Sequence, residues 1–112
     1  MKSLKCVIRP EKLEDLKKEL SSVGITGMMA SEIKGFGKQK GKTEHYRGAE
    51  YHVSFVTKVL LEVVVADSLV DRVVDKMIAV ARTGEIGDGK IFVSEISDVI
   101  RIRTGERGEQ AL

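Results

Sequence analysis

A glycine-rich turn beside a lysine is the first candidate for chemistry in this sequence. Its four residues lie between an expected helix and an expected strand: Gly87, Asp88, Gly89 and Lys90. Because glycine lacks a Cβ, successive backbone N–H groups can turn toward an anion there, and the lysine adds a positive charge. The pattern indicates a phosphate-binding turn, and the alternative is an ordinary helix-to-strand turn.

Two arginines in the stretch VIRIRTG could supply further cations to the same anion. In an extended chain, residues two apart point to the same side, so Arg101 and Arg103 would project together. Ile100 and Ile102 would then pack on the opposite side. A charge-assisted hydrogen bond to a phosphate oxygen is worth about 1.5 to 3 kcal/mol. The pair favours a polyphosphate site over the alternative, a solvated edge strand defended by charge.

The segment 36–54 is basic, contains several glycines and is long for a connection inside a small domain. Such segments are usually functional or mobile. Its GKT at 41–43 does not complete a P-loop, because Phe36 stands where that motif needs glycine. GFGKQKG at 35–41 has one residue too many for the dinucleotide fingerprint. What remains is a run of exposed backbone amides and lysines that could bind a small dianion.

The other polar residues do not indicate covalent catalysis. Taken alone, Gln39 suggests a solvated loop side chain and Lys58 a solubilising charge at the start of a strand. His45 and His52 are seven positions apart without a helical i, i+4 partner, so we expect no metal site between them. Cys6, the single cysteine, suits a core position better than a nucleophile.

Two copies of one strand–helix pattern are expected to position these groups. Residues 2–8 alternate as a strand does, and an amphipathic helix follows that stops at Gly24. A second strand begins at Lys58, and Asp67 or Ser68 should cap the helix behind it. Shifting the first unit forward by 57 positions aligns its apolar residues with those of the second.

This doubled βαβ pattern predicts an α+β, ferredoxin-like fold with a four-stranded antiparallel sheet and both helices on one face. The remaining strands are expected at about 28–34 and at IFVSEI, 91–96. The opposite face of the sheet would be bare. Because the second strand carries apolar residues toward both faces, for example Leu60 and Leu61, we expect self-association, as in a symmetric ring.

Length and composition limit the possible functions. A chain of 112 residues fits a single domain, 1–112. A net charge of +2, 4% aromatic residues and no tryptophan argue against nucleic-acid binding. The longest nearly apolar stretch, 59–66, is far shorter than the roughly 20 residues of a membrane helix. The N-terminal residues do not resemble a secretory signal, so a cytoplasmic location is expected.

Four motifs resemble the PII nitrogen-regulatory signalling proteins, and the resemblance covers the whole chain. They are KGFGKQKG at 34–41, YRGAEY at 46–51, TGEIGDGKIFV at 83–93 and VIRIRTGERG at 99–108. Four motifs in order are far more specific than a lone glycine-rich loop. The resemblance implies a homotrimeric sensor rather than an enzyme. It also implies a long regulatory loop at about 36–54, a nucleotide loop at about 83–90 and a C-terminal segment at about 99–112.

The resemblance implies ATP or ADP bound in clefts between neighbouring subunits. One chain would hold the phosphates through Gly87, Asp88, Gly89 and Lys90. The next chain would reach the same phosphates with Arg101 and Arg103. The adenine would lie near Met29 and Val64, and three further residues would line the cleft: Gly35, Gly37 and Lys38.

The resemblance also implies a 2-oxoglutarate site at the base of the long loop. Gln39 would ligate a Mg²⁺ ion that also contacts the triphosphate and 2-oxoglutarate. Lys58 would pair with the distal carboxylate of the acid. Backbone amides around three loop residues would complete the site: Gly37, Lys40 and Gly41.

The implied partners are ammonium channels and the enzymes and regulators of nitrogen assimilation, so the membrane would be reached only through a channel. Tyr51 occupies the position that is nucleotidylated in some branches of the family. Ala49 replaces the serine that is phosphorylated in another branch. Met29 and Lys38 replace a common threonine and arginine, which bears on nucleotide affinity.

Three alternatives stay open at this point. The first is a PII-like nucleotide sensor with weak ATPase activity and a target outside nitrogen metabolism. The second is a small phosphotransferase, which would need a base or nucleophile beside the turn, where only Asp88 and Thr83 stand. The third, an RNA-binding module, lacks an aromatic stacking platform.

Overall fold

The computed structural model describes residues 1–36, 43–46, 49–52 and 55–112. The elements are, in chain order, β1 (Lys2–Ile8), α1 (Leu13–Ser22), β2 (Met29–Phe36), β3 (Thr43–Tyr46), β4 (Ala49–His52), β5 (Phe55–Val65), α2 (Val70–Ala81) and β6 (Lys90–Glu95). Short 3₁₀ turns precede α1 at Pro10–Lys12 and α2 at Asp67–Leu69, and a third lies at Gly108–Ala111.

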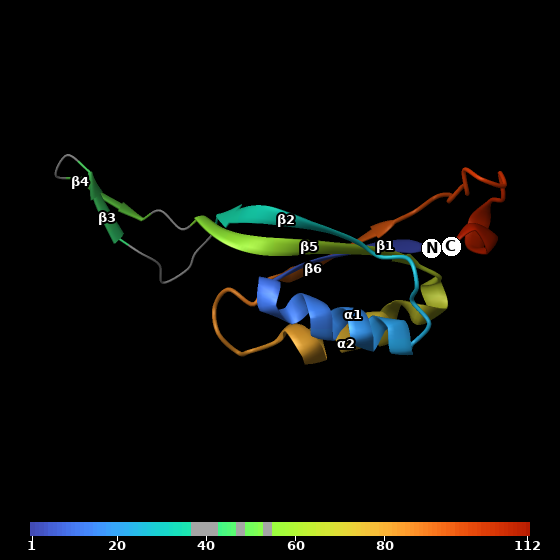
Figure 1. The fold of residues 1–112 in the computed structure, drawn as a ribbon, viewed down its shortest axis with the longest axis horizontal. Coiled ribbons are helices and arrows are strands. Elements are labelled where there is room, and N and C mark those ends of the chain that lie inside the picture. The colour runs from blue at the N-terminus through green and yellow to red at the C-terminus, as the bar shows by residue number, and fades with distance from the viewer. Residues whose placement is uncertain (37–42, 47–48, 53–54) are drawn as a thin grey trace.

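The main sheet has four antiparallel strands in the order β2-β5-β1-β6. Both α1 and α2 lie on one face of it, and neither covers the other face (Figure 1). β3 and β4 pair with each other in a separate two-stranded sheet. This is the ferredoxin-like arrangement that the doubled βαβ pattern predicts.

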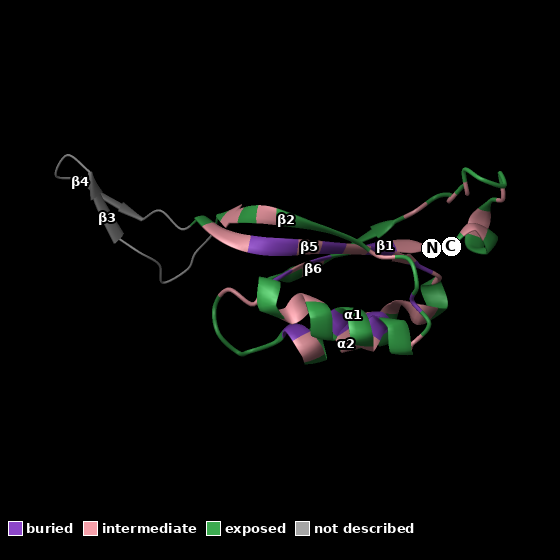
Figure 2. Cartoon of the chain, viewed as in Figure 1, coloured by how far each residue is buried: buried purple, intermediate pink, exposed green. Residues whose placement is uncertain are grey.

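The core lies between the sheet and the helices, as the buried segments show (Figure 2). The sheet contributes alternate residues of its two central strands: Leu4, Cys6 and Ile8 from β1, and Val59, Leu61, Val63 and Val65 from β5. The helices contribute residues one turn apart: Leu16 and Leu20 from α1, and Val73 and Met77 from α2. Burying each such side chain contributes about 1.5 to 3 kcal/mol, which explains why these periodicities decide the fold.

Most expected boundaries agree with the structure. Gly24 follows the end of α1 with φ of 90°, a conformation that glycine adopts without strain. The expected strand at 28–34 is β2, and it runs on to Phe36. β5 begins at Phe55 rather than Lys58, because β2 pairs with it as far as Phe36 opposite Phe55.

The predicted cap of α2 is wrong. Neither the 3₁₀ turn nor α2 has a side-chain cap, and Ala66 stands at the N-cap of the turn. The Asp67 carboxylate instead lies 3.0 Å from the amino group of Met1 and 3.7 Å from Lys2 Nζ. These two cations compete with the backbone for the carboxylate. None of the helices in the described residues is both long and apolar enough to cross a membrane.

Candidate functional site

The glycine turn, residues 87–90, joins the loop after α2 to β6. Gly87 and Gly89 have backbone φ angles of 106° and 103°, which residues other than glycine rarely adopt. A Cβ added at Gly89 would lie 1.7 Å from the carbonyl oxygen of Val7, at the end of β1. Gly89 is therefore required by the close approach of the turn to β1, whatever else the turn binds.

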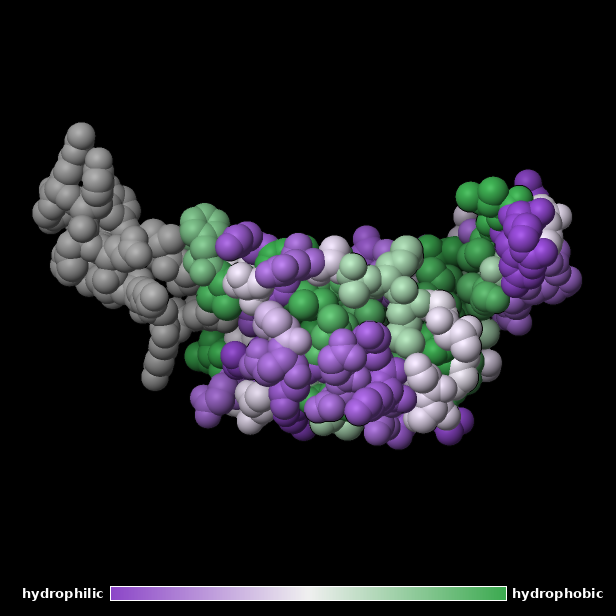
Figure 3. Space-filling model, in the orientation of Figure 1, coloured by the Kyte–Doolittle hydropathy of each residue, from purple (hydrophilic) through white to green (hydrophobic). Residues whose placement is uncertain are grey.

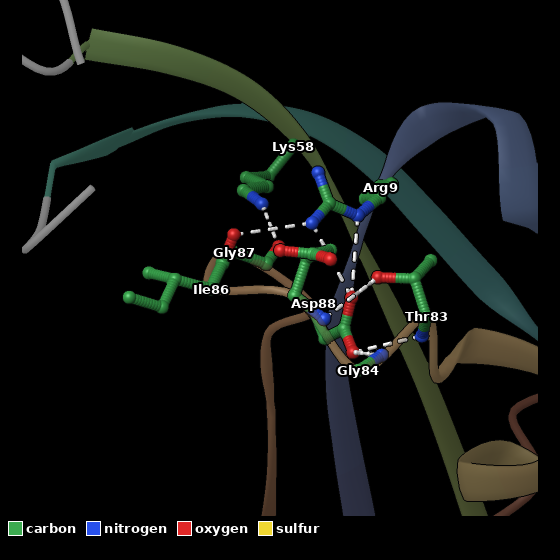
Figure 4. A network of polar contacts seen from close by, with 8 residues as sticks. Arg9, Lys58, Thr83, Gly84, Ile86, Gly87 and Asp88 are labelled. Atoms are coloured by element: carbon green, nitrogen blue, oxygen red, sulfur yellow. Dashed lines mark hydrogen bonds and ion pairs between the residues drawn. The ribbon is translucent and has the colours of Figure 1, made fainter. Parts of the chain in front are cut away.

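The carboxylate of Asp88 joins the turn by hydrogen bonds to the chain that precedes it (Figure 4). It accepts hydrogen bonds from the Thr83 hydroxyl, from the backbone N–H of Thr83 at 2.8 Å and from that of Gly84 at 2.9 Å. Arg9 Nε and Nη2 lie 3.3 Å from its Oδ1. The bonds from the hydroxyl and then the N–H of Thr83 hold the pKa of Asp88 well below its usual range.

These bonds limit what Asp88 and Thr83 can do chemically. A carboxylate that accepts this many hydrogen bonds is a poor general base, and the Thr83 hydroxyl already donates to it. Asp88 and Thr83, the two candidate residues for phosphotransferase chemistry, are thus hydrogen-bonded to each other. What Asp88 can offer to an anion is its backbone N–H rather than its charged side chain.

Two cations, Arg9 just after β1 and Lys58 in β5, donate to carbonyl groups in the turn and directly before it (Figure 4). Arg9 Nη2 donates to the Ile86 carbonyl at 3.2 Å. Lys58 Nζ donates to the Gly87 carbonyl. Arg9 was not among the residues that the sequence singled out, and its partner Ile86 is 77 positions away. No local pattern could have indicated that contact.

The interpretation of Lys58 as a solubilising charge is wrong. The residue is 6% exposed and lies inside β5 rather than at its start. Burial lowers the pKa of its ammonium group, and the Arg9 guanidinium lowers it further, whereas Asp88 and Glu11 oppose this. A buried ammonium group beside the turn can attract an anion, which a solvated surface lysine would do weakly.

Cys6 has the core position that the sequence indicates. It is 1% exposed, and burial raises the pKa of its thiol to about 11. The thiol therefore stays protonated at neutral pH and is unsuited to nucleophilic chemistry.

Gly35 and Lys58 come together with the glycine turn at one end of the sheet. A Cβ at Gly35 would lie 3.1 Å from Lys58 Cγ, so a larger residue would press on the lysine that holds Gly87. Five expected ligand residues lie outside the described residues: Gly37, Lys38, Gln39, Lys40 and Gly41. Tyr51 lies in β4, opposite Glu44 of β3.

Met29 and Val64 line a hollow of about 500 Å³ at the other end of the sheet. Its wall also includes Glu62, Leu69 and Leu112, so the C-terminal residues help to form it. Met29 is 60% exposed. Apolar surface is visible where the C-terminal segment joins the sheet (Figure 3). A flat, largely apolar ring such as a nucleobase suits a hollow of this kind.

The expected extended stretch around Arg101 and Arg103 is wrong in part. Arg101 Nη1 pairs with Glu106 at 2.8 Å, and its Nη2 donates to the Gln110 carbonyl at 3.0 Å. The chain turns after Arg101, because the N–H of Gly105 donates to the Arg101 carbonyl at 2.7 Å and Gly105 has φ of 74°. Ile102 is consequently fully exposed instead of packed.

A single chain keeps the glycine turn and these arginines apart. β6 begins at Lys90 and ends at Glu95, and the chain runs on from there to Arg101. Its 6 residues span about 20 Å at roughly 3.3 Å per residue. The C-terminal segment lies beyond the far end of the sheet from the loop after α2 (Figure 1). One phosphate chain can reach both groups only if they come from different copies.

Comparison with known proteins gives a consistent result over the whole chain. The family model described as nitrogen regulatory protein P-II matches residues 1–106. The chain is 58% identical to the nitrogen regulatory protein P-II of Nostoc punctiforme over 112 residues, all of both chains. It is 56% identical to nitrogen regulatory protein P-II 1 of Escherichia coli strain K12, again over the full length of both. With its ferredoxin-like fold and these matches, the chain belongs to the P-II family of nitrogen regulatory proteins.

Proposed function

We propose that the protein senses the adenylate state and 2-oxoglutarate by binding ATP or ADP in clefts between its copies. The observation that carries this proposal is the separation of two half-sites on one chain. The glycine turn with Lys90 lies at one end of β6, and Arg101 lies beyond the other. Two copies placed side by side would complete a polyphosphate site that one copy lacks, and a closed ring would repeat it at each interface.

The base and the phosphates would be bound by different surfaces of the cleft. The hollow beside Met29 and Val64 supplies the apolar contact that an adenine ring needs. Met29 has no hydroxyl group, so the ring would be held by packing at this position. The backbone N–H groups of the glycine turn, Lys90 and the two arginines would hold the phosphates.

The acid would bind beside Lys58 and depend on the nucleotide. Lys58 supports this part because it is a buried cation next to the turn. The amide oxygen of Gln39, outside the described residues, fits the oxygen ligands that Mg²⁺ prefers. Gln39 would help to hold a Mg²⁺ ion, whose positive charge would attract both the phosphates and 2-oxoglutarate. Because ATP would also help to hold the ion, the acid should bind well only with ATP.

Occupancy of these sites would change the conformation of the loop 36–54, which partners would read. The proposed partners are an ammonium channel or the enzymes and regulators of nitrogen assimilation, in keeping with the relatives' name of nitrogen regulatory proteins. Nucleotidylation of Tyr51 would add bulk and negative charge to this loop and weaken those contacts.

Calorimetric titration with ATP, ADP and 2-oxoglutarate, alone and combined with Mg²⁺, tests the proposal. We expect both nucleotides to bind and the acid to bind only with Mg²⁺ and ATP. Light scattering should give three times the 12.4 kDa chain mass. A protein that ignores both nucleotides contradicts the proposal. Rapid multiple-turnover phosphate release would instead favour the alternative with ATPase activity.

A further inference from the structure

Arg9 lies outside the glycine turn and donates hydrogen bonds to Asp88 within it and to Ile86 just before it. It follows β1 directly and lies on the sheet side of the turn (Figure 4). Its guanidinium donates to the Ile86 carbonyl and to the Asp88 carboxylate, so one planar group spans both sides of Gly87. Lys58 holds the intervening Gly87 carbonyl from β5.

The direction of these carbonyl groups fixes the direction of the N–H groups. In a planar trans peptide, the carbonyl of one residue and the N–H of the next point in opposite directions. No peptide bond in the described ranges 1–36, 43–46, 49–52 and 55–112 is cis. With the Ile86 and Gly87 carbonyls turned toward Arg9 and Lys58, the N–H groups of Gly87 and Asp88 point away from those cations.

These two N–H groups are available to a ligand. Among the residues that the structure describes, none accepts a close hydrogen bond from the N–H of Gly87 or of Asp88, and residues 86 and 87 form a turn that directs the Asp88 N–H toward the Glu85 carbonyl. Backbone N–H groups are strong donors that are normally paired, so two adjacent ones without a close acceptor make a site for an anion.

We propose that Arg9 is a positioning residue for phosphate binding, because it holds the 86–88 peptides so that the N–H groups of Gly87 and Asp88 face the phosphates. The inference rests on the proposed function, and it adds a residue that would not itself contact the nucleotide. Asp88 neutralises much of the charge on Arg9, so the geometry of its hydrogen bonds matters more than its charge. A lysine at position 9 would keep the charge but could not donate from a planar fork to both acceptors.

Two substitutions and one control test this role. Arg9→Gln removes the charge and the fork, and Arg9→Lys removes only the fork. Arg72→Gln removes an exposed arginine near the start of α2 and serves as the control. Calorimetry should show ATP and ADP binding weakened at least tenfold in both Arg9 variants and unchanged in the control. Wild-type affinity in Arg9→Lys would overturn the inference, because charge alone would then suffice.

Amide NMR spectra separate positioning from a general effect on folding. On adding ATP to the wild-type protein, we expect the N–H signals of Gly87 and Asp88 to shift downfield as they bond to phosphate. In the Arg9 variants these shifts should shrink, while signals of core residues such as Leu16 and Val73 stay in place. Undiminished shifts at Gly87 and Asp88, with only a lower melting temperature, would show a purely structural role and overturn the inference.

The wild-type titration distinguishes failure of the inference from failure of the proposed function. If the wild-type protein does not bind ATP, the proposed function is wrong and the inference falls with it. If the wild-type protein binds ATP and both Arg9 variants bind it equally well, only the role of Arg9 is wrong.

Discussion

Three charged side chains, those of Asp88, Arg9 and Lys58, hold the backbone of the glycine turn by hydrogen bonds without any ligand. Asp88 draws the backbone of Thr83 and Gly84 toward itself, and Arg9 ties this group to the end of β1. Lys58 adds a bond from β5 to the Gly87 carbonyl. Asp88 offsets only one of the two positive charges of Arg9 and Lys58, so one positive charge remains in this small network. The turn therefore combines backbone donors with a residual positive charge.

The lowered pKa of Asp88 predicts a stability contribution that depends on pH. Because the folded carboxylate has a lower pKa than the unfolded one, near 3.9, the contribution is present above about pH 4 and is lost as pH falls further. Asp88→Asn should therefore unfold at lower urea concentration than the wild type at pH 7. The difference should shrink steadily between about pH 4 and pH 2. A difference that is constant with pH would contradict this origin.

At the level of elements, β1 and β6 position the turn. The turn enters β6 directly at Lys90, and Gly89 lies against the Val7 carbonyl of β1. The contact leaves no room for a side chain, so the turn packs directly on the end of β1. At its other end, β6 leads toward the C-terminal segment and sets its distance from the turn.

Alanine substitutions at two glycines test this contact. Gly84→Ala and Gly89→Ala both place a side chain at positive φ, which costs about 1 to 2 kcal/mol. Only Gly89→Ala adds a clash with backbone, since nothing lies within 4 Å of a Cβ at Gly84. Urea unfolding should show a loss of about 3 kcal/mol or more for Gly89→Ala and about 1 to 2 kcal/mol for Gly84→Ala. Equal losses would mean that the turn does not pack tightly on β1.

The loop 36–54 is the element through which ligand binding would reach partners, and Gln39 tests the connection. Gln39→Ala removes the expected Mg²⁺ ligand and leaves the glycine turn and arginines intact. It should spare ATP binding and abolish the binding of 2-oxoglutarate in calorimetry. Glu44→Gln, elsewhere in the loop, is the matched control. Undiminished acid binding by Gln39→Ala would rule out the proposed Mg²⁺ bridge.

At the level of the whole molecule, a single chain leaves one face of its sheet uncovered by helices. The sheet has one face without helices, and the two groups proposed to bind one polyphosphate lie at its two ends. Exposed apolar residues accompany this open architecture, including Phe92 at 55% and Met29 at 60%. Association of several copies would cover apolar surface and complete the nucleotide site at once.

A complementation experiment tests whether the site is shared between copies. Arg103→Ala and Lys90→Ala should each weaken ATP binding at least tenfold without unfolding the protein, since neither side chain is buried. When the two variants are mixed, denatured and refolded together, some interfaces combine an intact Lys90 with an intact Arg103. Those interfaces should bind ATP with near wild-type affinity. Absence of such sites in the mixture would show that the two residues do not act across an interface.

Local patterns in the sequence were sufficient to predict the fold and to indicate a special turn at residues 87–90. Alternating residues such as Leu61 and Val63, and helical spacing such as Leu16 and Leu20, indicate strands and helices because burial depends on the faces they create. Glycines at 87 and 89 indicate a special turn because few other residues adopt positive φ.

Tertiary structure alone decided which side chains hold the turn and which groups are kept apart. Arg9 meets Asp88 from a distant part of the chain, Lys58 is buried, and Arg101 closes a turn on Glu106 instead of extending. Burial and long-range hydrogen bonding depend on which strands become neighbours, and spacing along the sequence does not contain that information. The effect of the length of β6 is likewise visible only in the tertiary structure, where this strand separates the two halves of one proposed site.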